Sequence, residues 1–517
     1  MNRFEQGWRA SGLMLHFTCL PSPYGIGDLG PSAHQFIDFL HKANFHFWQV
    51  LPTNPTSPSL GNSPYTAFST FAGNELLISP DLMLTEGFID LSDLQRAHQA
   101  QSSQVDFDAT IHRKGALIDL AFQRALGALE HNDVFERFCL DNASWLNDYS
   151  FFIAAKDAFG GVAWTDWPAD LADRDDGALA KYGTKFSKEI LRVKFGQFLF
   201  FSQLGRLKQA AKEKGVGLIG DTAFYVNHDS SDVWSHRELF SLNDDGTLSF
   251  MAGVPPDYFA KTGQLWGNPI YDWSAHQKEG YRWWKGRILH NLGLFDWVRL
   301  DHFRAFSAFW SVEPRSKTAQ SGSWRPCPGA ELFETVMQGR DSLNIIAEDL
   351  GVITPDVTDL RRRFGFPGMR VLQFGFGSDQ PLSSHTPFRI PADNLVYSAT
   401  HDNNTTKGWY EHDLDDQARE RLTKLAGWPV TADDAAEALV RLAYLSPAAL
   451  CVVTVQDLLN LGQESRLNTP GTAKGNWGYR LNSLDDLSPH LADALSELGQ
   501  LSGRDNYTHP NILTYEN

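Results

Sequence analysis

The chain has 517 residues, of which 42% are hydrophobic and 21% are charged, proportions that are ordinary for a soluble globular protein. Its 62 acidic and 45 basic residues give a net charge of −17, and no run of five or more basic residues occurs. This charge balance argues against nucleic acid and against anionic membranes as partners.

The cysteines and the apolar segments of the chain indicate in which cellular compartment the protein is found. The four cysteines lie far apart and form no CxxC pair, which predicts reduced thiols and argues against a disulfide scaffold or a zinc site. The N-terminal residues lack the apolar stretch of a signal peptide, and the most apolar window, 442–455, is too short to span a bilayer. We therefore expect a cytoplasmic protein with no membrane partner.

Short apolar runs that end in polar residues recur along the chain. They cover residues 45–52, 74–79, 216–221, 295–301, 343–349, 369–376, 394–402 and 450–457. Continuous apolar runs are typical of strands buried on both faces, and amphipathic helical patterns such as 31–44 and 194–215 precede several of them. The alternation predicts an α/β fold, a (β/α)8 TIM barrel with residues 45–52 as its first strand. A doubly wound open sheet is the alternative.

The spacing of these runs is uneven. Far more residues separate the second and third runs than one crossover helix needs, so we expect an inserted helical subdomain at about 80–195. A second long gap, about 222–294, is rich in Gly, Pro and aromatic residues and predicts an irregular lobe over the C-terminal face of the barrel. Residues 1–517 are then one catalytic barrel carrying two insertions.

Acidic residues end several of the apolar runs, where barrel enzymes carry their catalytic groups. They are Asp221, Asp301, the pair Glu348–Asp349, Asp402 and Asp457. Asp also caps helices in many such loops, which is the alternative explanation for two or three of them. It explains Asp301 poorly, because Arg299 lies two residues earlier on the same face of the strand and a buried charge needs a partner.

Carboxylates that converge from neighbouring strands suit glycoside chemistry. Arg299 would keep Asp301 ionised as a nucleophile. Glu348 follows the apolar "NIIA", where a raised pKa would suit a general acid. A third carboxylate, with His401, could hold ring hydroxyls as the sugar distorts.

Eight sequence segments, in order from about residue 20 to 480, resemble the 4-α-glucanotransferases, the amylomaltase or disproportionating-enzyme family of the α-amylase clan. They are "SPYGIGDLG", "QVLPTNPT", "NSPYTAFSTFAGNELLIS", "AGVPPDYFAKTGQLWGNPIYDW", "VRLDHFRAF", "IAEDLGVITPDV", "THDNNTTKGWY" and "QDLLNLGQESRLNTPGTAKGNW". The resemblance implies a retaining enzyme that moves α-1,4-glucan segments to the 4-hydroxyl of a maltodextrin or of glucose, through a covalent intermediate, with no obligate protein partner.

The resemblance also implies roles for individual residues. Asp301 would be the nucleophile, Glu348 the general acid/base and Asp402 the stabiliser of the transition state. Arg299 and His401 would support them.

Four further positions complete this pattern or depart from it. Asp221 would be a further sugar ligand. The chain departs from the family at Asn404, where an acid is common, and at Ser398–Ala399, where Thr–Gly is common. These departures leave the three core carboxylates in place.

Aromatic side chains suit acceptor subsites because they stack on the apolar faces of glucose rings. By resemblance, Tyr258 and Trp266 lie on a loop beside the acceptor sites, and Tyr65 matches a tyrosine linked to a second glucan-binding groove. Two other functions use the same residues: an α-1,4-glucan hydrolase on the same scaffold, and a non-catalytic glucan-binding barrel. The chemistry of these residues does not distinguish either function from the transferase.

Signals for cofactors are weak. "GIGDLG", residues 25–30, matches the dinucleotide fingerprint in letters, but two prolines precede it in place of a strand. The histidines show no HExxH spacing, and no GxSxG elbow occurs. We expect neither a metal nor a cofactor, because glycosyl transfer from an oligosaccharide needs none.

Overall fold

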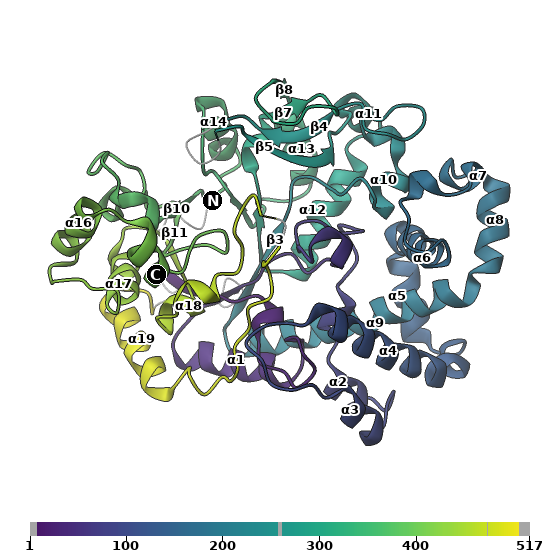
Figure 1. Ribbon diagram of the computed structural model, residues 1–517, viewed down its shortest axis with the longest axis horizontal. Coiled ribbons are helices and arrows are strands. Elements are labelled where there is room, and N and C mark those ends of the chain that lie inside the picture. The colour runs from purple at the N-terminus through teal and green to yellow at the C-terminus, as the bar shows by residue number, and fades with distance from the viewer. Residues whose placement is uncertain (1–7, 257–260, 473, 506–517) are drawn as a thin grey trace.

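The computed structural model describes residues 8–256, 261–472 and 474–505 (Figure 1). Eight parallel strands form its central sheet, in the order β10-β11-β12-β1-β2-β3-β6-β9. Their bounds are β1 (Ala10–Met14), β2 (Phe47–Gln49), β3 (Gly217–Thr222), β6 (Trp297–Leu300), β9 (Ile345–Ala347), β10 (Met369–Val371), β11 (Leu395–Tyr397) and β12 (Leu450–Thr454). The sheet is nearly closed, because the Ala347 N–H donates to the Pro367 carbonyl next to β10 (2.9 Å). The predicted barrel is confirmed.

One predicted strand was wrong, and another is a strand but not the first one. The first strand is β1, whose five residues ASGLM are all buried, so 45–52 contains the second strand. Its small residues made β1 hard to recognise as an apolar run. The run 74–79 is not a strand, because the Asn74 side chain accepts from the Leu76 N–H and starts a 3-10 turn, and Pro80 then begins a helix.

Alternate strand residues fill the barrel interior. Phe47 and Ile219 belong to the interior cluster, whereas their neighbours Trp48 and Leu218 pack outward against the surrounding helices. This alternation follows from the two-residue period of a strand, and it makes the barrel a packed core with its functional groups at one end.

Helices surround the barrel, and one group of them forms a separate mass on its right in Figure 1. Between β2 and β3 the chain forms α2 (Pro80–Thr85), α3 (Leu91–Ala97), α4 (Phe107–Leu129), α5 (Asp133–Asp141), α6 (Ala143–Ala158), α7 (Ala169–Ala172), α8 (Asp176–Lys185) and α9 (Ser187–Glu213). The predicted insertion at 80–195 falls on α2 to α8 and the start of α9. The rest of α9 leads back to β3.

The remaining helices are distributed along the barrel repeats. They are α1 (Pro31–Lys42), α10 (Ser231–Ser235), α11 (Trp273–Lys278), α12 (Arg282–Leu294), α13 (Gly329–Met337), α14 (Pro355–Arg363), α15 (Thr406–Gly408), α16 (Asp416–Ala426), α17 (Ala435–Leu445), α18 (Val455–Leu458) and α19 (Pro489–Leu501). Within the described residues, none of these helices has the length and apolar character needed to cross a membrane.

A small antiparallel sheet lies above the barrel, at the top of Figure 1. Its order is β5-β4-β7-β8, with β4 (Met251–Val254), β5 (Gln264–Pro269), β7 (Ala308–Val312) and β8 (Gly322–Pro326). The predicted lobe at 222–294 falls on α10, β4, β5, α11 and α12. The sheet also takes two strands from the segment after β6, which places it directly over the end of that barrel strand.

A buried arginine ties the last described residues to the barrel. The Arg504 guanidinium donates to the carbonyls of Ala10, at the start of β1, and Ala449, just before β12 (2.7 and 3.2 Å). It also donates to the carbonyls of Ala443, Tyr444, Ser446 and Ala448 at 3.0–3.4 Å. Burial lowers the pKa of Arg504 to about 10, so it stays protonated at neutral pH.

Replacing Arg504 with Ala is expected to lower the free energy of unfolding by about 3 kcal/mol, because it leaves several buried carbonyls without a donor. Urea unfolding followed by circular dichroism measures this. Arg282→Ala is the control, since that side chain is 82% exposed. Equal stability of the two variants would show that the bonds of Arg504 to β1 and to the segment before β12 do not stabilise the fold.

Candidate active site

The predicted carboxylates gather at the carboxyl ends of the barrel strands. Asp221 is the fifth residue of β3, Asp301 directly follows β6, and Glu348 directly follows β9. Asp402 lies on the loop after β11. Because β3, β6 and β9 are neighbours in a parallel sheet, their carboxyl ends meet at one edge of the barrel.

Arg299 lies between two of these carboxylates. Its Nη1 donates to both oxygens of Asp221 (2.9 and 2.7 Å), and its Nη2 lies 2.9 Å from Asp301 Oδ1. The predicted pairing of Arg299 with Asp301 is confirmed. Burial alone would lower the pKa of Arg299, but the Asp221 and Asp301 carboxylates hold it above its usual value. The arginine is therefore a permanent positive charge beside Asp301.

Glu348 has a different environment. Two backbone donors hold its carboxyl group: the His302 N–H at 2.8 Å from Oε2 and the Leu350 N–H at 2.9 Å from Oε1. Burial, followed by the nearby charge of Asp301, raises the pKa of Glu348 to about 8. The group is therefore mostly protonated at neutral pH, which is the state that a general acid needs.

Asp402 is the most open of the three, with a side chain that is 44% exposed. Its Oδ1 accepts from Asn468 Nδ2 (2.6 Å) and lies 3.4 Å from His401 Nε2. Its carbonyl accepts from Arg466 (2.7 Å). Sequence reasoning missed Asn468 and Arg466, although both lie in the "GQESRLNTPG" segment on which the family resemblance partly rests.

The Tyr65 side chain lies inside this site. Its hydroxyl donates to Asp221 Oδ2 (2.7 Å), and its ring stacks on His401 with centroids 5.0 Å apart and planes at 15°. The expectation that Tyr65 belongs to a separate groove was wrong. Local sequence cannot show a contact between residues that are 156 positions apart.

Asp457 anchors the loop that carries His401 and Asp402. Its carboxylate accepts from the Ser398 hydroxyl (2.6 Å) and from the Thr406 N–H (2.9 Å), at the two ends of the loop 398–406. Ser398 is one of the positions that depart from the family pattern, and here its hydroxyl is used. Asp457 is buried and has no direct contact with the three candidate catalytic carboxylates among the bonds of the described residues.

Among the bonds of the described residues, Asn404 forms no hydrogen bond with Asp402. Its Nδ2 donates to Asp413 (3.2 Å) and Gln463 (3.4 Å), while its Oδ1 has no hydrogen-bond partner within the described part of the chain. An acid at this position would face the Asp413 carboxylate. The departure from the family pattern thus alters the support of the loop, away from the reacting groups.

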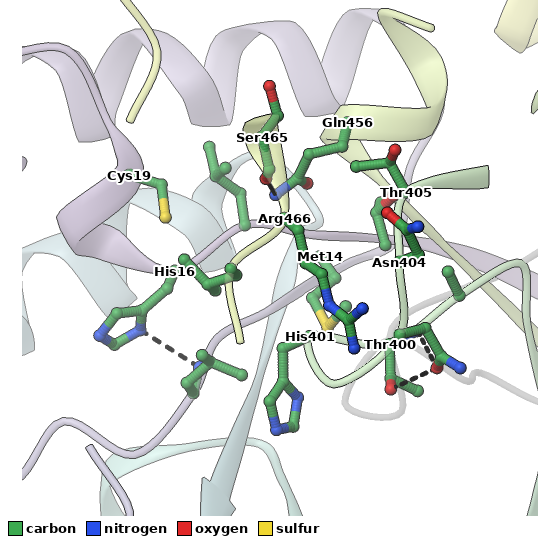
Figure 2. A pocket seen from close by; sticks show the side chains of 16 residues that line it. Met14, His16, Cys19, Thr400, His401, Asn404, Thr405, Gln456, Ser465 and Arg466 are labelled. Atoms are coloured by element: carbon green, nitrogen blue, oxygen red, sulfur yellow. Dashed lines mark hydrogen bonds between the residues drawn. The ribbon is translucent and has the colours of Figure 1, made fainter. Parts of the chain in front are cut away.

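A small cavity lies behind His401 (Figure 2). Its volume is about 20 Å³, enough for one water molecule. Figure 2 labels His16, Thr400, His401, Asn404 and Arg466 around it, and Asp301, Glu348 and Asp402 do not line it. The cavity lies beside the loop that carries His401 and Asp402 and is too small for a sugar.

Trp266 lies on β5, at the edge of the upper sheet, and is 37% exposed. Its ring is perpendicular to His302, with centroids 4.9 Å apart, so it stands next to the residue that follows Asp301. Tyr258 lies outside the described residues. No group of three or more His, Cys, Asp or Glu side chains in residues 8–256, 261–472 and 474–505 has a metal-binding arrangement.

Comparison with known proteins decides the family. The family model described as 4-alpha-glucanotransferase matches residues 15–486. The chain belongs to the 4-alpha-glucanotransferase family. It is 44% identical to the 4-alpha-glucanotransferase of Synechocystis sp. over 501 residues, which cover 96% of this chain and 98% of that protein. Over 505 residues it is 41% identical to the Thermus thermophilus enzyme, covering 96% and 99% of the two chains.

Solved structures agree with this assignment. An amylomaltase from Streptococcus agalactiae in complex with acarbose superposes with a TM-score of 0.92 at 36% identity, covering 96% of this chain and all of that one. An amylomaltase from Corynebacterium glutamicum, at 18% identity and a TM-score of 0.74, shares the fold. Family membership favours the transferase over the hydrolase and over a non-catalytic glucan-binding barrel.

Proposed function

We propose that this chain transfers α-1,4-glucan segments to the 4-hydroxyl of a maltodextrin or of glucose, with retention of configuration. The observation that carries this proposal is the pairing of Asp301 with the buried Arg299, next to a Glu348 whose pKa is raised. A carboxylate paired with a buried cation, beside a carboxyl group whose pKa is raised, suits the nucleophile and the general acid of a double displacement.

In the first step, an oxygen of Asp301 attacks the anomeric carbon of the donor glucan. The glycosidic bond breaks, and Glu348 gives its proton to the departing 4-oxygen. A covalent glycosyl-enzyme remains. Asp402 and Tyr65 would hold the hydroxyls of the distorted sugar, and the Tyr65 ring, stacked on His401, would offer it an apolar face. Asp221 has no exposed side-chain surface and binds Arg299 and Tyr65, so it would hold these two side chains in place and would not contact the sugar.

In the second step, the acceptor hydroxyl attacks the same carbon and releases Asp301. Glu348, now ionised, takes the acceptor's proton, so each cycle returns both carboxyl groups to their starting states. Trp266 would stack on the acceptor sugar. An oriented acceptor competes with water through proximity, which favours transfer over hydrolysis. The acarbose complex of the Streptococcus agalactiae amylomaltase supports a glucan-like ligand.

Incubation with maltotriose tests the function. We expect glucose and a ladder of longer maltodextrins, while the total of reducing ends stays constant, because each transfer breaks and forms one bond. Chromatography by chain length and a reducing-end assay measure this. Rising reducing ends without longer products would indicate a hydrolase, and maltodextrin affinity without any product would indicate a binding protein.

The pH dependence of kcat/KM is expected to show an alkaline limb near pH 8. Glu348 must be protonated for the first step, and its pKa is raised from 4.5 to about 8, so activity is present below this pH and is lost above it. Circular dichroism at each pH is the control for unfolding. A limb centred near pH 5 would show that Glu348 is not the acid.

We also propose that the reaction takes place in the cytoplasm. All four cysteines are free thiols, which suits a reducing compartment. Fractionation of the source cells, with immunodetection of the chain, tests this.

A further inference from the structure

His302 directly follows the proposed nucleophile and has an unusual backbone. Its φ of 51° lies in the left-handed region, which residues other than glycine adopt rarely. This conformation directs the His302 N–H to Glu348 Oε2 (2.8 Å). The backbone of His302 therefore helps to place the proposed general acid/base.

The imidazole ring of His302 packs against the exposed tryptophan. Its centroid lies 4.9 Å from that of Trp266, with the rings at 85°, and 6.4 Å from that of Tyr225. Trp266 also meets Tyr225 at 5.8 Å, so the three rings form one cluster. The His302 Nε2 is buried and has no hydrogen-bond partner among the described residues. Burial lowers the pKa of His302 to about 4, so the neutral ring packs as an aromatic surface.

We propose that His302 is a positioning residue that sets the acceptor platform relative to the acid/base: its ring fixes Trp266 and its backbone N–H fixes Glu348. This inference rests on the proposed function. In the second step the acceptor's hydroxyl must reach both the anomeric carbon and Glu348. Because His302 contacts both Trp266 and Glu348, it fixes the position of the stacking surface relative to that of the proton acceptor. If Trp266 were loosely held, water would compete better with the acceptor for the covalent intermediate.

Two variants separate the ring from the backbone. His302→Asn removes the ring, and Asn adopts the left-handed region more readily than most residues, so the N–H to Glu348 should be kept. His302→Gly also removes the ring and also tolerates the left-handed region, but it leaves no side chain at this position. Thermal melting shows whether each is folded. Trp266→Ala and the double variant His302→Asn/Trp266→Ala complete a double-mutant cycle.

The assay uses maltotriose as donor and labelled glucose as acceptor, at varied glucose concentration. For His302→Asn and His302→Gly we expect the KM for glucose to rise about five- to tenfold, the worth of one aromatic contact. The kcat at saturating glucose should stay within about threefold of wild type, because the reacting groups are unchanged. The share of donor that is hydrolysed should rise. In the Trp266→Ala background, His302→Asn should change the KM by less than about twofold.

Two results would overturn the inference. One is an unchanged KM for glucose with a lower kcat and melting temperature, which is the pattern of a merely structural residue. The other is a KM effect of His302→Asn that multiplies with that of Trp266→Ala, which would show that the two act separately. If the wild-type chain itself transfers nothing to labelled glucose, the proposed function fails first, and that outcome is distinguishable from both.

Discussion

Replacing Asp301 with Asn is expected to lower turnover of maltotriose by about 10⁴-fold or more, because an amide cannot form the covalent intermediate. The fold should be kept, since Arg299 retains both of its bonds to Asp221. Initial rates by reducing-end and chain-length analysis, with circular dichroism on the same samples, measure both effects.

The matched control for this variant is Asp341→Asn, because Asp341 is exposed and precedes β9, at the opposite end of the barrel. It should keep wild-type rates. Mass spectrometry of denatured wild-type enzyme, quenched during turnover of α-maltosyl fluoride, should find the sugar attached to Asp301. A folded Asp301→Asn with substantial activity, or a sugar attached elsewhere, would refute the assignment of the nucleophile.

Replacing Glu348 with Gln is expected to lower the maltotriose rate by about 10²- to 10⁴-fold, the usual contribution of a general acid/base. The result should depend on the leaving group. Fluoride departs from α-maltosyl fluoride without a proton, so the first step should survive in Glu348→Gln. The second step should be slow, because no base takes the acceptor's proton. We therefore expect a burst of about one fluoride per enzyme, followed by a slow phase.

Glu334→Gln, at an exposed position on α13, is the control and should behave as wild type. If Glu348→Gln loses activity equally on maltotriose and on the fluoride, with no burst, then Glu348 acts through structure and not through its proton. This outcome would leave the assignment of Asp301 intact.

The barrel and the carboxylates at its end could be predicted from the sequence for a physical reason. Period-two alternation placed Arg299 and Asp301 on one face, and a buried charge requires a partner, so their ion pair was predictable. The position of strand β1 was not, since Ala10, Ser11 and Gly12 lack the bulk that marks a buried strand.

Contacts between distant segments could not be predicted from local sequence patterns either. Asn468 reaches Asp402 from 66 positions away, and Trp266 meets His302 from the four-stranded upper sheet. Neither follows from hydrophobic periodicity, because each depends on how loops are laid over the barrel end. The pKa of Glu348 was expected to be raised from its apolar flank, but the part played by the Asp301 charge required the fold.

The pairing of β1 with β12 has a consequence for synthesis on the ribosome. β1 is translated first and its partner strand more than four hundred residues later, since Ala10 pairs with Leu450. At about 5–20 residues per second, the nascent β1 waits roughly 20 to 90 s with one edge open. An open, strongly apolar strand edge invites aggregation. The small residues Ala10, Ser11 and Gly12 make this edge a poor template for pairing with other chains. The composition that makes β1 difficult to predict from the sequence therefore also lowers the risk that the nascent chain aggregates.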